Sequence, residues 1–141
     1  IQDLAQGLKH CPNHPHLFYK LGLAYYADHQ YKRAINSLKS ALKNEPEVAM
    51  EADVYYHIGL AYCRLEQFEK AIYPLTKTIE MEPSNINYLH ERAKAYQMVG
   101  DHEAAVDDFN NVIKNNPMNA HAHFRRAFSL KELKRYAEGV N

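Results

Sequence analysis

The stretch Tyr55-Tyr56-His57-Ile58-Gly59-Leu60-Ala61-Tyr62 decides the fold, because its order of apolar, small and aromatic residues returns along the chain of 141 residues. The small residue of the stretch recurs at steps of 37, 34 and 34 residues. Such a regular return of one pattern is the sequence signature of a repeat protein. The recurring small position is held in turn by Gly22, Gly59, Ala93 and Ala127.

Three further landmarks keep the same register. An aromatic or apolar residue follows each small residue by three positions, a second small residue follows by twelve, and a proline closes each unit. These landmarks are Tyr25, Tyr62, Tyr96 and Leu130, then Ala34, Ala71, Ala105 and Gly139, then Pro46, Pro83 and Pro117, with Pro12 one period upstream. A period of 34 residues with this order resembles the tetratricopeptide repeat, and the resemblance covers almost the whole chain.

Each unit is expected to be a pair of antiparallel helices. Phe18, Leu21 and Tyr25 have the spacing of one apolar stripe on a helix, and residues 31–42 carry a second stripe. The connection over residues 27–30 is short and polar, so the two helices must lie close together. The sequence therefore predicts an all-α protein, and the resemblance implies a right-handed α-solenoid acting as a single domain.

The period also predicts where each unit begins and ends. The extra residues before the second unit favour helix, so its first helix should begin about one turn early. Pro74 should kink the second helix of that unit without breaking it. Both ends break the period, so we expect a fragment of a longer array whose exposed apolar ends allow self-association. The expected units are 1–12 (the second helix of a partial repeat), 15–48, 49–85, 86–119 and 120–141 (an incomplete repeat).

Composition argues against several kinds of partner. The 17 basic and 17 acidic residues cancel, so no excess charge attracts nucleic acid or an anionic membrane. No apolar run approaches the ~18 residues of a membrane-spanning helix, which predicts no membrane insertion. The two cysteines, Cys11 and Cys63, suit a reducing, cytoplasmic location better than a disulfide framework.

No motif predicts an enzyme, a cofactor or a metal site. The five glycines are scattered, so they form no phosphate-binding loop, and neither cysteine has the context of a nucleophile. The histidine pairs are two residues apart and would diverge on a helix. Asp107 and Asp108 are expected on a solvated outer face.

The resemblance implies a binding groove. In the tetratricopeptide family the first helices of the repeats line a concave groove. In this chain the residues at the ligand-facing offsets are aromatic or aliphatic at both ends of the groove and charged in the middle. This pattern favours a scaffold or adaptor that binds a peptide or partner helix of unknown identity. The candidate groove residues are His16, Tyr19, Lys20, Leu23, Tyr26, Asp53, Tyr56, His57, Leu60, Arg64, His90, Glu91, Lys94, Phe124, Arg125 and Phe128.

Two alternatives stay open at this point. Tyr19, Leu23, Tyr56 and Leu60 can equally serve to pack neighbouring first helices together. The chain can also be a non-catalytic region that recruits partners to an enzyme domain outside these residues. His57 and His90 occupy groove positions on adjacent units, which raises the hypothesis of pH-dependent binding.

Many members of the family bind the carboxyl-terminal tail of heat-shock chaperones through lysines, asparagines and an arginine in the groove. In this chain only Arg125 matches that clamp in type, and Glu91 has the wrong sign. We therefore expect no capture of such a tail. The matching positions are Tyr19, Leu23, His57, Asn87 and Glu91 in one register, and Tyr56, Leu60, Glu91, His121 and Arg125 in the other.

Overall fold

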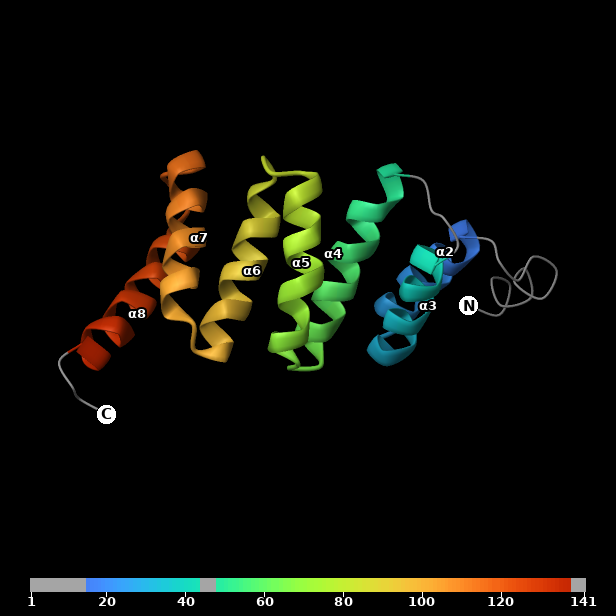
Figure 1. Cartoon of the computed structure of the whole chain (residues 1–141), viewed down its shortest axis with the longest axis horizontal. Helices are drawn as coiled ribbons and strands as arrows, with labels where there is room; N and C mark the ends of the chain where they lie inside the picture. Colours follow the sequence, from blue (N-terminus) through green and yellow to red (C-terminus); the bar gives the residue numbers. More distant parts are fainter. Residues whose placement is uncertain (1–14, 44–47, 138–141) are drawn as a thin grey trace.

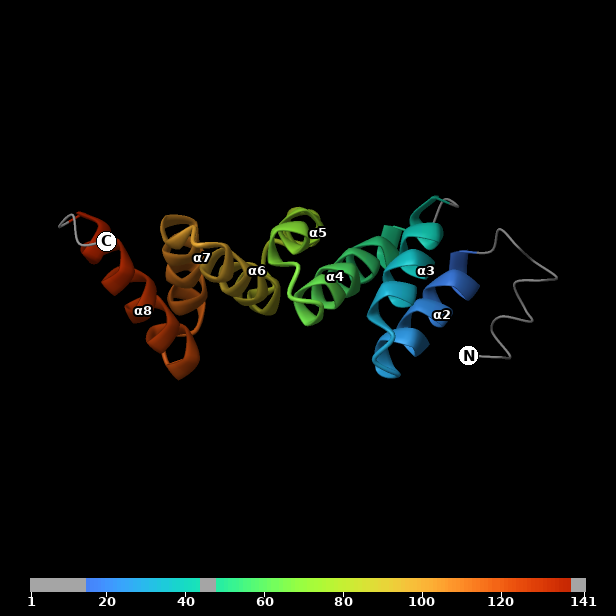
Figure 2. The same cartoon turned by 90° about the horizontal axis from the view of Figure 1, so that it is seen from below.

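The computed structural model describes residues 15–43 and 48–137, and all secondary structure in these ranges is helical. The helices follow one another along the long axis in chain order, from α2 and α3 at one end to α8 at the other (Figures 1 and 2). The helices are α2 (Pro15–Ala27), α3 (Tyr31–Lys43), α4 (Val48–Arg64), α5 (Phe68–Met81), α6 (Ile86–Val99), α7 (His102–Asn115) and α8 (Ala120–Ala137). The predicted all-α solenoid is confirmed; the expected helix over residues 1–12 lies outside the described residues.

The sequence determines how each helix begins and turns. The Asn85 and Asp101 side chains cap α6 and α7 by accepting hydrogen bonds from backbone N–H groups of the first turn. The turn between the two helices of a unit has one residue with positive φ, and it recurs in register at His29, Glu66 and Gly100. Each pair of helices therefore reverses direction through the same backbone geometry.

Two expectations concerned the second unit. Helix α4 begins at Val48, eleven residues before Gly59, whereas α2 begins seven residues before Gly22. The early start by about one turn is confirmed. Helix α5 runs without a break through the buried Pro74, as expected, while the kink stays a prediction.

Small residues let the two helices of a unit approach closely. A Cβ added to Gly59 would lie 2.7 Å from Leu75 Cγ, and one added to Gly22 would lie 2.6 Å from Leu38 Cγ. Both distances are shorter than real Cβ contacts, so the glycines leave room for leucines sixteen residues later. The helix pairs α2–α3 and α4–α5 are packed through this contact.

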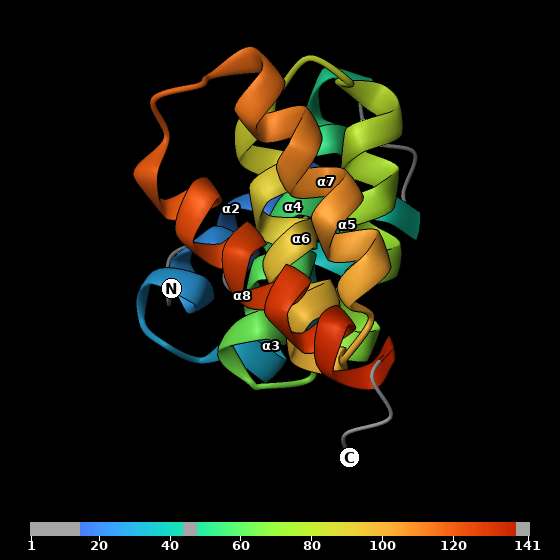
Figure 3. The same ribbon diagram turned by 90° about the vertical axis from the view of Figure 1, so that its left-hand side faces the viewer.

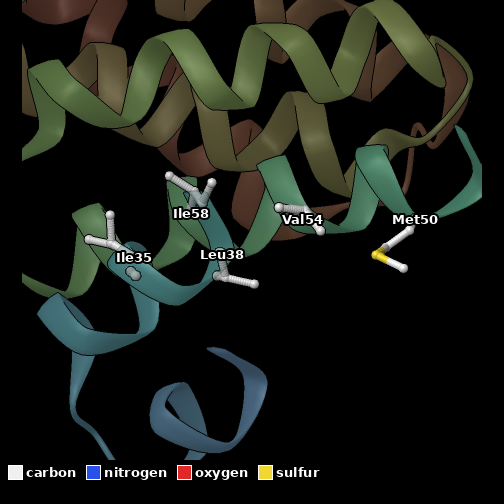
Figure 4. Close-up of a cluster of buried hydrophobic side chains, with 6 residues drawn as sticks. Ile35, Leu38, Met50, Val54 and Ile58 are labelled. Atoms are coloured by element: carbon white, nitrogen blue, oxygen red, sulfur yellow. The ribbon is translucent and has the colours of Figure 1, made fainter. Parts of the chain in front are cut away.

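The core lies between the units as well as within them. In the cluster that joins the first two units, α3 supplies Ile35 and Leu38 and α4 supplies Met50, Val54 and Ile58 (Figure 4). A similar cluster on α6 and α7 surrounds the fully buried Phe109 and extends to Ala122 of α8. Each unit thus buries its apolar stripe against the next one, as repeat proteins do.

The first helices approach one another and the second helices do not. Helix α2 contacts α4, α4 contacts α6, and α6 contacts α8. Within the described ranges, no Cα atom of α3 comes within 8 Å of one in α5, and the same holds for α5 and α7. Seen end-on, α5 and α7 lie on one side of the stack and α2 and α8 on the other (Figure 3). The stack therefore curves toward its first helices.

One expectation about the outer face was wrong. Asp107 is exposed, but Asp108 is 3% exposed and accepts hydrogen bonds from Arg92 at 2.7 and 2.8 Å. Arg92 also donates to the Thr76 hydroxyl of α5 at 3.3 Å. The two acids diverge on the helix, and the second faces a guanidinium that neutralises its charge in a buried setting. Arg92 thus bridges the second helices of two neighbouring units.

This ion pair gives a prediction about stability. Asp108→Ala leaves the Arg92 charge largely buried and unpaired, which should lower the free energy of unfolding by about 3 kcal/mol. The double variant Arg92→Leu/Asp108→Ser introduces the residues found at the equivalent positions of the first unit, Leu21 and Ser37. It should lower the free energy of unfolding by less than ~1 kcal/mol. Urea unfolding followed by circular dichroism measures both; a double variant no more stable than Asp108→Ala would contradict the account.

Candidate functional site

The face formed by α2, α4, α6 and α8 carries all the candidate groove residues, because they share the same offsets on the first helices. These residues differ in their contacts and exposure. Some tie neighbouring first helices together, some line a hollow between α4 and α6, and some are exposed on α8. Binding of a partner by these residues stays a prediction.

At the junction of α2 and α4, polar candidates form a hydrogen-bonded chain. The Tyr19 hydroxyl donates to the Asp53 carboxylate, and His57 Nδ1 donates to the Asp53 carbonyl at 2.9 Å, with Oδ2 of the same residue at 3.4 Å. The Tyr26 ring contacts the His57 ring edge to face at 5.6 Å. These side chains hold two units together across the face.

The junction of α4 and α6 uses an aromatic pair. The ring of Tyr56 lies 4.7 Å from that of Tyr88, which is 8% exposed. Sequence reasoning missed Tyr88 as a partner of Tyr56, although both are tyrosines on first helices of adjacent units. At the next junction the Gln97 amide donates to the Arg125 carbonyl and to Ser129 Oγ, both at 2.6 Å. Packing between units therefore accounts for part of the tyrosine-rich pattern.

A hollow of about 240 Å³ lies between α4 and α6. Four candidates line it, namely Leu60, Arg64, Glu91 and Lys94. Cys63, Phe68 and Ala95 complete the wall, and these three were not among the candidates. Cys63 has a groove offset and so could have been found, whereas Phe68 begins α5 and reaches the hollow only through the geometry of the preceding turn.

The hollow combines an apolar interior with a charged rim. Leu60 and Ala95 are aliphatic, while Lys94 Nζ pairs with Glu91 Oε1 at 3.3 Å. Burial, with the nearby Glu91 carboxylate, raises the pKa of the Cys63 thiol to about 11. The thiol is therefore protonated at neutral pH and behaves as a weakly polar part of the wall rather than as a nucleophile.

The remaining candidates differ in exposure. Lys20 is exposed, and His16 and Leu23 are partly buried on α2. On α8 the side chains of Phe124 and Phe128 are 76% and 51% exposed. These two rings stand one helical turn apart at the far end of the face, where they contact less of the molecule than the tyrosines do.

His57 and His90 have opposite environments. Burial works to lower the pKa of His57, but hydrogen bonds and the negative charge of Asp53 outweigh it and raise the pKa above its ordinary value. Burial lowers the pKa of His90, and the positive charge of Lys94 lowers it further. His90 Nε2 is buried without a hydrogen-bond partner, and its ring lies 5.7 Å from Phe109.

Within residues 15–43 and 48–137, no three His, Cys, Asp or Glu side chains come together as a metal site. None of the described helices is both long enough and apolar enough to cross a membrane.

The paired helices and their register define a tetratricopeptide-repeat-like protein. The sequence model of the family described as the fourth ARM domain of tetratricopeptide repeat protein 21 matches residues 17–132. The chain belongs to this family. A comparison with curated proteins found no matching sequence.

Several solved structures share the fold at low sequence identity. The TPR domain of OM64 from Arabidopsis is 22% identical over 84% of this chain and 95% of its own, with a TM-score of 0.71. YrrB, described as a TPR protein with an unusual peptide-binding site, is 20% identical over 93% of this chain and 66% of its own, with a TM-score of 0.86. The first TPR of Spaghetti (RPAP3), bound to the HSP90 peptide SRMEEVD, is 18% identical over 85% and 93%, with a TM-score of 0.74. These similarities establish the fold.

The two histidines provide a prediction about pH. In a titration followed by two-dimensional NMR of the imidazole nitrogens, His57 should titrate above the ordinary pKa of histidine and His90 below it. The contribution of His57 to stability is then complete below its unfolded pKa and is lost as pH rises through its folded pKa. The contribution of His90 is complete above its unfolded pKa and is lost as pH falls through its folded pKa.

The matched control for the titration is Asp53→Asn, which removes the charge beside His57. This variant should lower the pKa of His57 and leave that of His90 unchanged. A reversed order of the two titrations in the unaltered chain would contradict the assigned environments.

Proposed function

We propose that the chain is a protein-interaction scaffold that binds a peptide or a partner helix on the face of its first helices. The observation that carries the proposal is the hollow between α4 and α6, which brings Leu60, Arg64, Glu91 and Lys94 together on the concave side of the stack. The apolar interior provides an anchor position for one side chain of a bound peptide, and the charged rim orients the peptide around that side chain.

Related structures support a partner of this kind. YrrB has an unusual peptide-binding site, and the first TPR of Spaghetti is bound to the HSP90 peptide SRMEEVD. In this chain, however, the positions of the chaperone-tail clamp hold Tyr19, Leu23 and His57, and the hollow contains Glu91. An acidic tail with a free carboxylate therefore meets few donors, and we infer a ligand with an aliphatic anchor instead.

The exposure of apolar side chains on α8 supports one further part of the proposal. Phe124, Phe128 and Leu130 are each about half exposed or more, which suits self-association through this helix. We also propose the unit boundaries 15–48, 49–85, 86–119 and 120–141, and a cytoplasmic location.

The groove is tested with peptides selected from a random display library on the intact chain. Leu60→Ala removes the aliphatic wall of the hollow and should weaken the selected peptides by about 1–2 kcal/mol, which is roughly 5- to 30-fold in Kd by calorimetry. The control Val106→Ala alters an aliphatic side chain of similar burial on α7 and should leave Kd unchanged. The peptide SRMEEVD should bind no more tightly than about 1 mM.

NMR spectra of the isotope-labelled chain identify where the peptides bind. NMR shift changes should cluster on α4 and α6 around the hollow. Selected peptides that bind Leu60→Ala and the unaltered chain equally well, or whose shift changes lie on α3, α5 and α7, would sink the groove proposal.

A further inference from the structure

A second hollow lies on the opposite side of α4, between α3 and α5. Its volume is about 380 Å³, within the range of sites that enclose a side chain or small ligand. It exists because the second helices do not approach one another, which leaves the outward face of α4 uncovered between them. Tyr55 and Tyr62, two turns apart on α4, form its floor, and Leu42 and Tyr73 form its walls.

The apolar surface of this hollow is accessible. Tyr73 is 64% exposed, and Tyr55, Tyr62 and Leu42 are each only partly buried. An exposed tyrosine beside other aromatic side chains presents the kind of surface that anchors a partner side chain.

The rim of the hollow is positively charged. Lys39 and Lys70 line it from α3 and α5, and no carboxylate of the described residues forms an ion pair with either. Lys39 Nζ lies 5.5 Å from the Tyr62 ring centre, and Lys77 Nζ lies 5.6 Å from that of Tyr73. The rings therefore hold ammonium groups at the edges of the hollow.

The charge is a local feature, because the whole chain has no formal net charge. Helix α3 carries two lysines, an arginine and a further terminal lysine without any acidic residue. Acids lie near both ends of the hollow: Glu80 pairs with Lys77 at 3.7 Å and Glu51 lies one turn before Tyr55 on α4, while Glu69 precedes Lys70 on α5 without forming an ion pair with it. The positive charges of Lys39 and Lys70 are therefore available to attract an acidic partner.

We propose that this hollow is a second docking surface, which takes a peptide segment carrying one aromatic side chain flanked by aspartate or glutamate. The ring enters between Tyr55, Tyr62 and Tyr73, and the flanking carboxylates meet Lys39 and Lys70 on the two sides. Charge complementarity selects an acidic peptide, and the zero net charge of the chain disfavours nucleic acid. This surface is separate from the groove, because α4 lies between them.

The probe is a fluorescently labelled peptide of twelve residues with one central phenylalanine and two glutamates on each side. Fluorescence anisotropy with the intact chain should give saturable binding that weakens as salt rises. Peptides with Phe replaced by Ala, or with all Glu replaced by Gln, should each bind at least about fivefold more weakly.

Two variants of the chain test the hollow itself. Tyr73→Ala removes an exposed ring, so the fold is retained, and Lys39→Glu/Lys70→Glu reverses the rim charge. Each should weaken the probe at least about fivefold. Lys114→Glu reverses a single charge at an exposed site on α7, away from the hollow, and should change Kd less than about twofold.

Four results of these experiments would overturn the proposal, and a fifth concerns a second copy of the chain. The four are an equal affinity for the Gln peptide, unchanged binding by both variants, NMR shift changes confined to the hollow between α4 and α6, and tighter binding of a uridine oligonucleotide than of the probe. A probe displaced by raising the concentration of the chain itself would assign the surface to a second copy, and would likewise overturn it.

Discussion

The close approach of the two helices within each unit is the constraint on which the rest of the structure depends. Gly22 and Gly59 leave room for Leu38 and Leu75, whose Cγ atoms lie where a Cβ would otherwise crowd them. In the third unit, Ala93 and Phe109 occupy the same positions sixteen residues apart and lie in one buried cluster. Because these contacts fix each pair as a rigid block, the blocks can only stack, and their apolar stripes are buried between neighbours.

Stacking of these blocks produces two different faces. The first helices contact one another, and polar and aromatic side chains such as Tyr19 with Asp53 and Tyr56 with Tyr88 join them. The second helices stay apart, so α4 shows two tyrosines between α3 and α5. The stacking of the helix pairs therefore produces two hollows. The one between α4 and α6 has a rim with charges of both signs, and the one between α3 and α5 has a cationic rim.

Sequence periodicity predicted what depends on spacing alone. The helix pairs, the register of Gly22 and Gly59 and the early start of α4 all follow from which residue recurs at which distance, and the structure confirms them. The burial of Asp108 could not be predicted in this way, because it depends on which way the Arg92 side chain turns from a different helix.

The candidate site shows the same limit. Offsets on the first helices placed Leu60, Arg64, Glu91 and Lys94 on one face, and the structure gathers them around one hollow. Offsets could not separate tyrosines that contact the next unit from side chains that line a cavity, since both kinds share a face. Phe68 was missed because its position depends on the turn before α5, a property of backbone geometry rather than of pattern.

Curvature toward the first helices is the central claim, and a pair of spin-label distances tests it most directly. In a chain with Cys11 and Cys63 replaced by serine, one pair of labels occupies Ala27 and Arg64, equivalent exposed positions on α2 and α4. The other occupies Lys32 and Glu69, equivalent exposed positions on α3 and α5. Double electron–electron resonance should give a longer mean distance for the second pair than for the first. An equal or shorter distance between Lys32 and Glu69 would contradict the account.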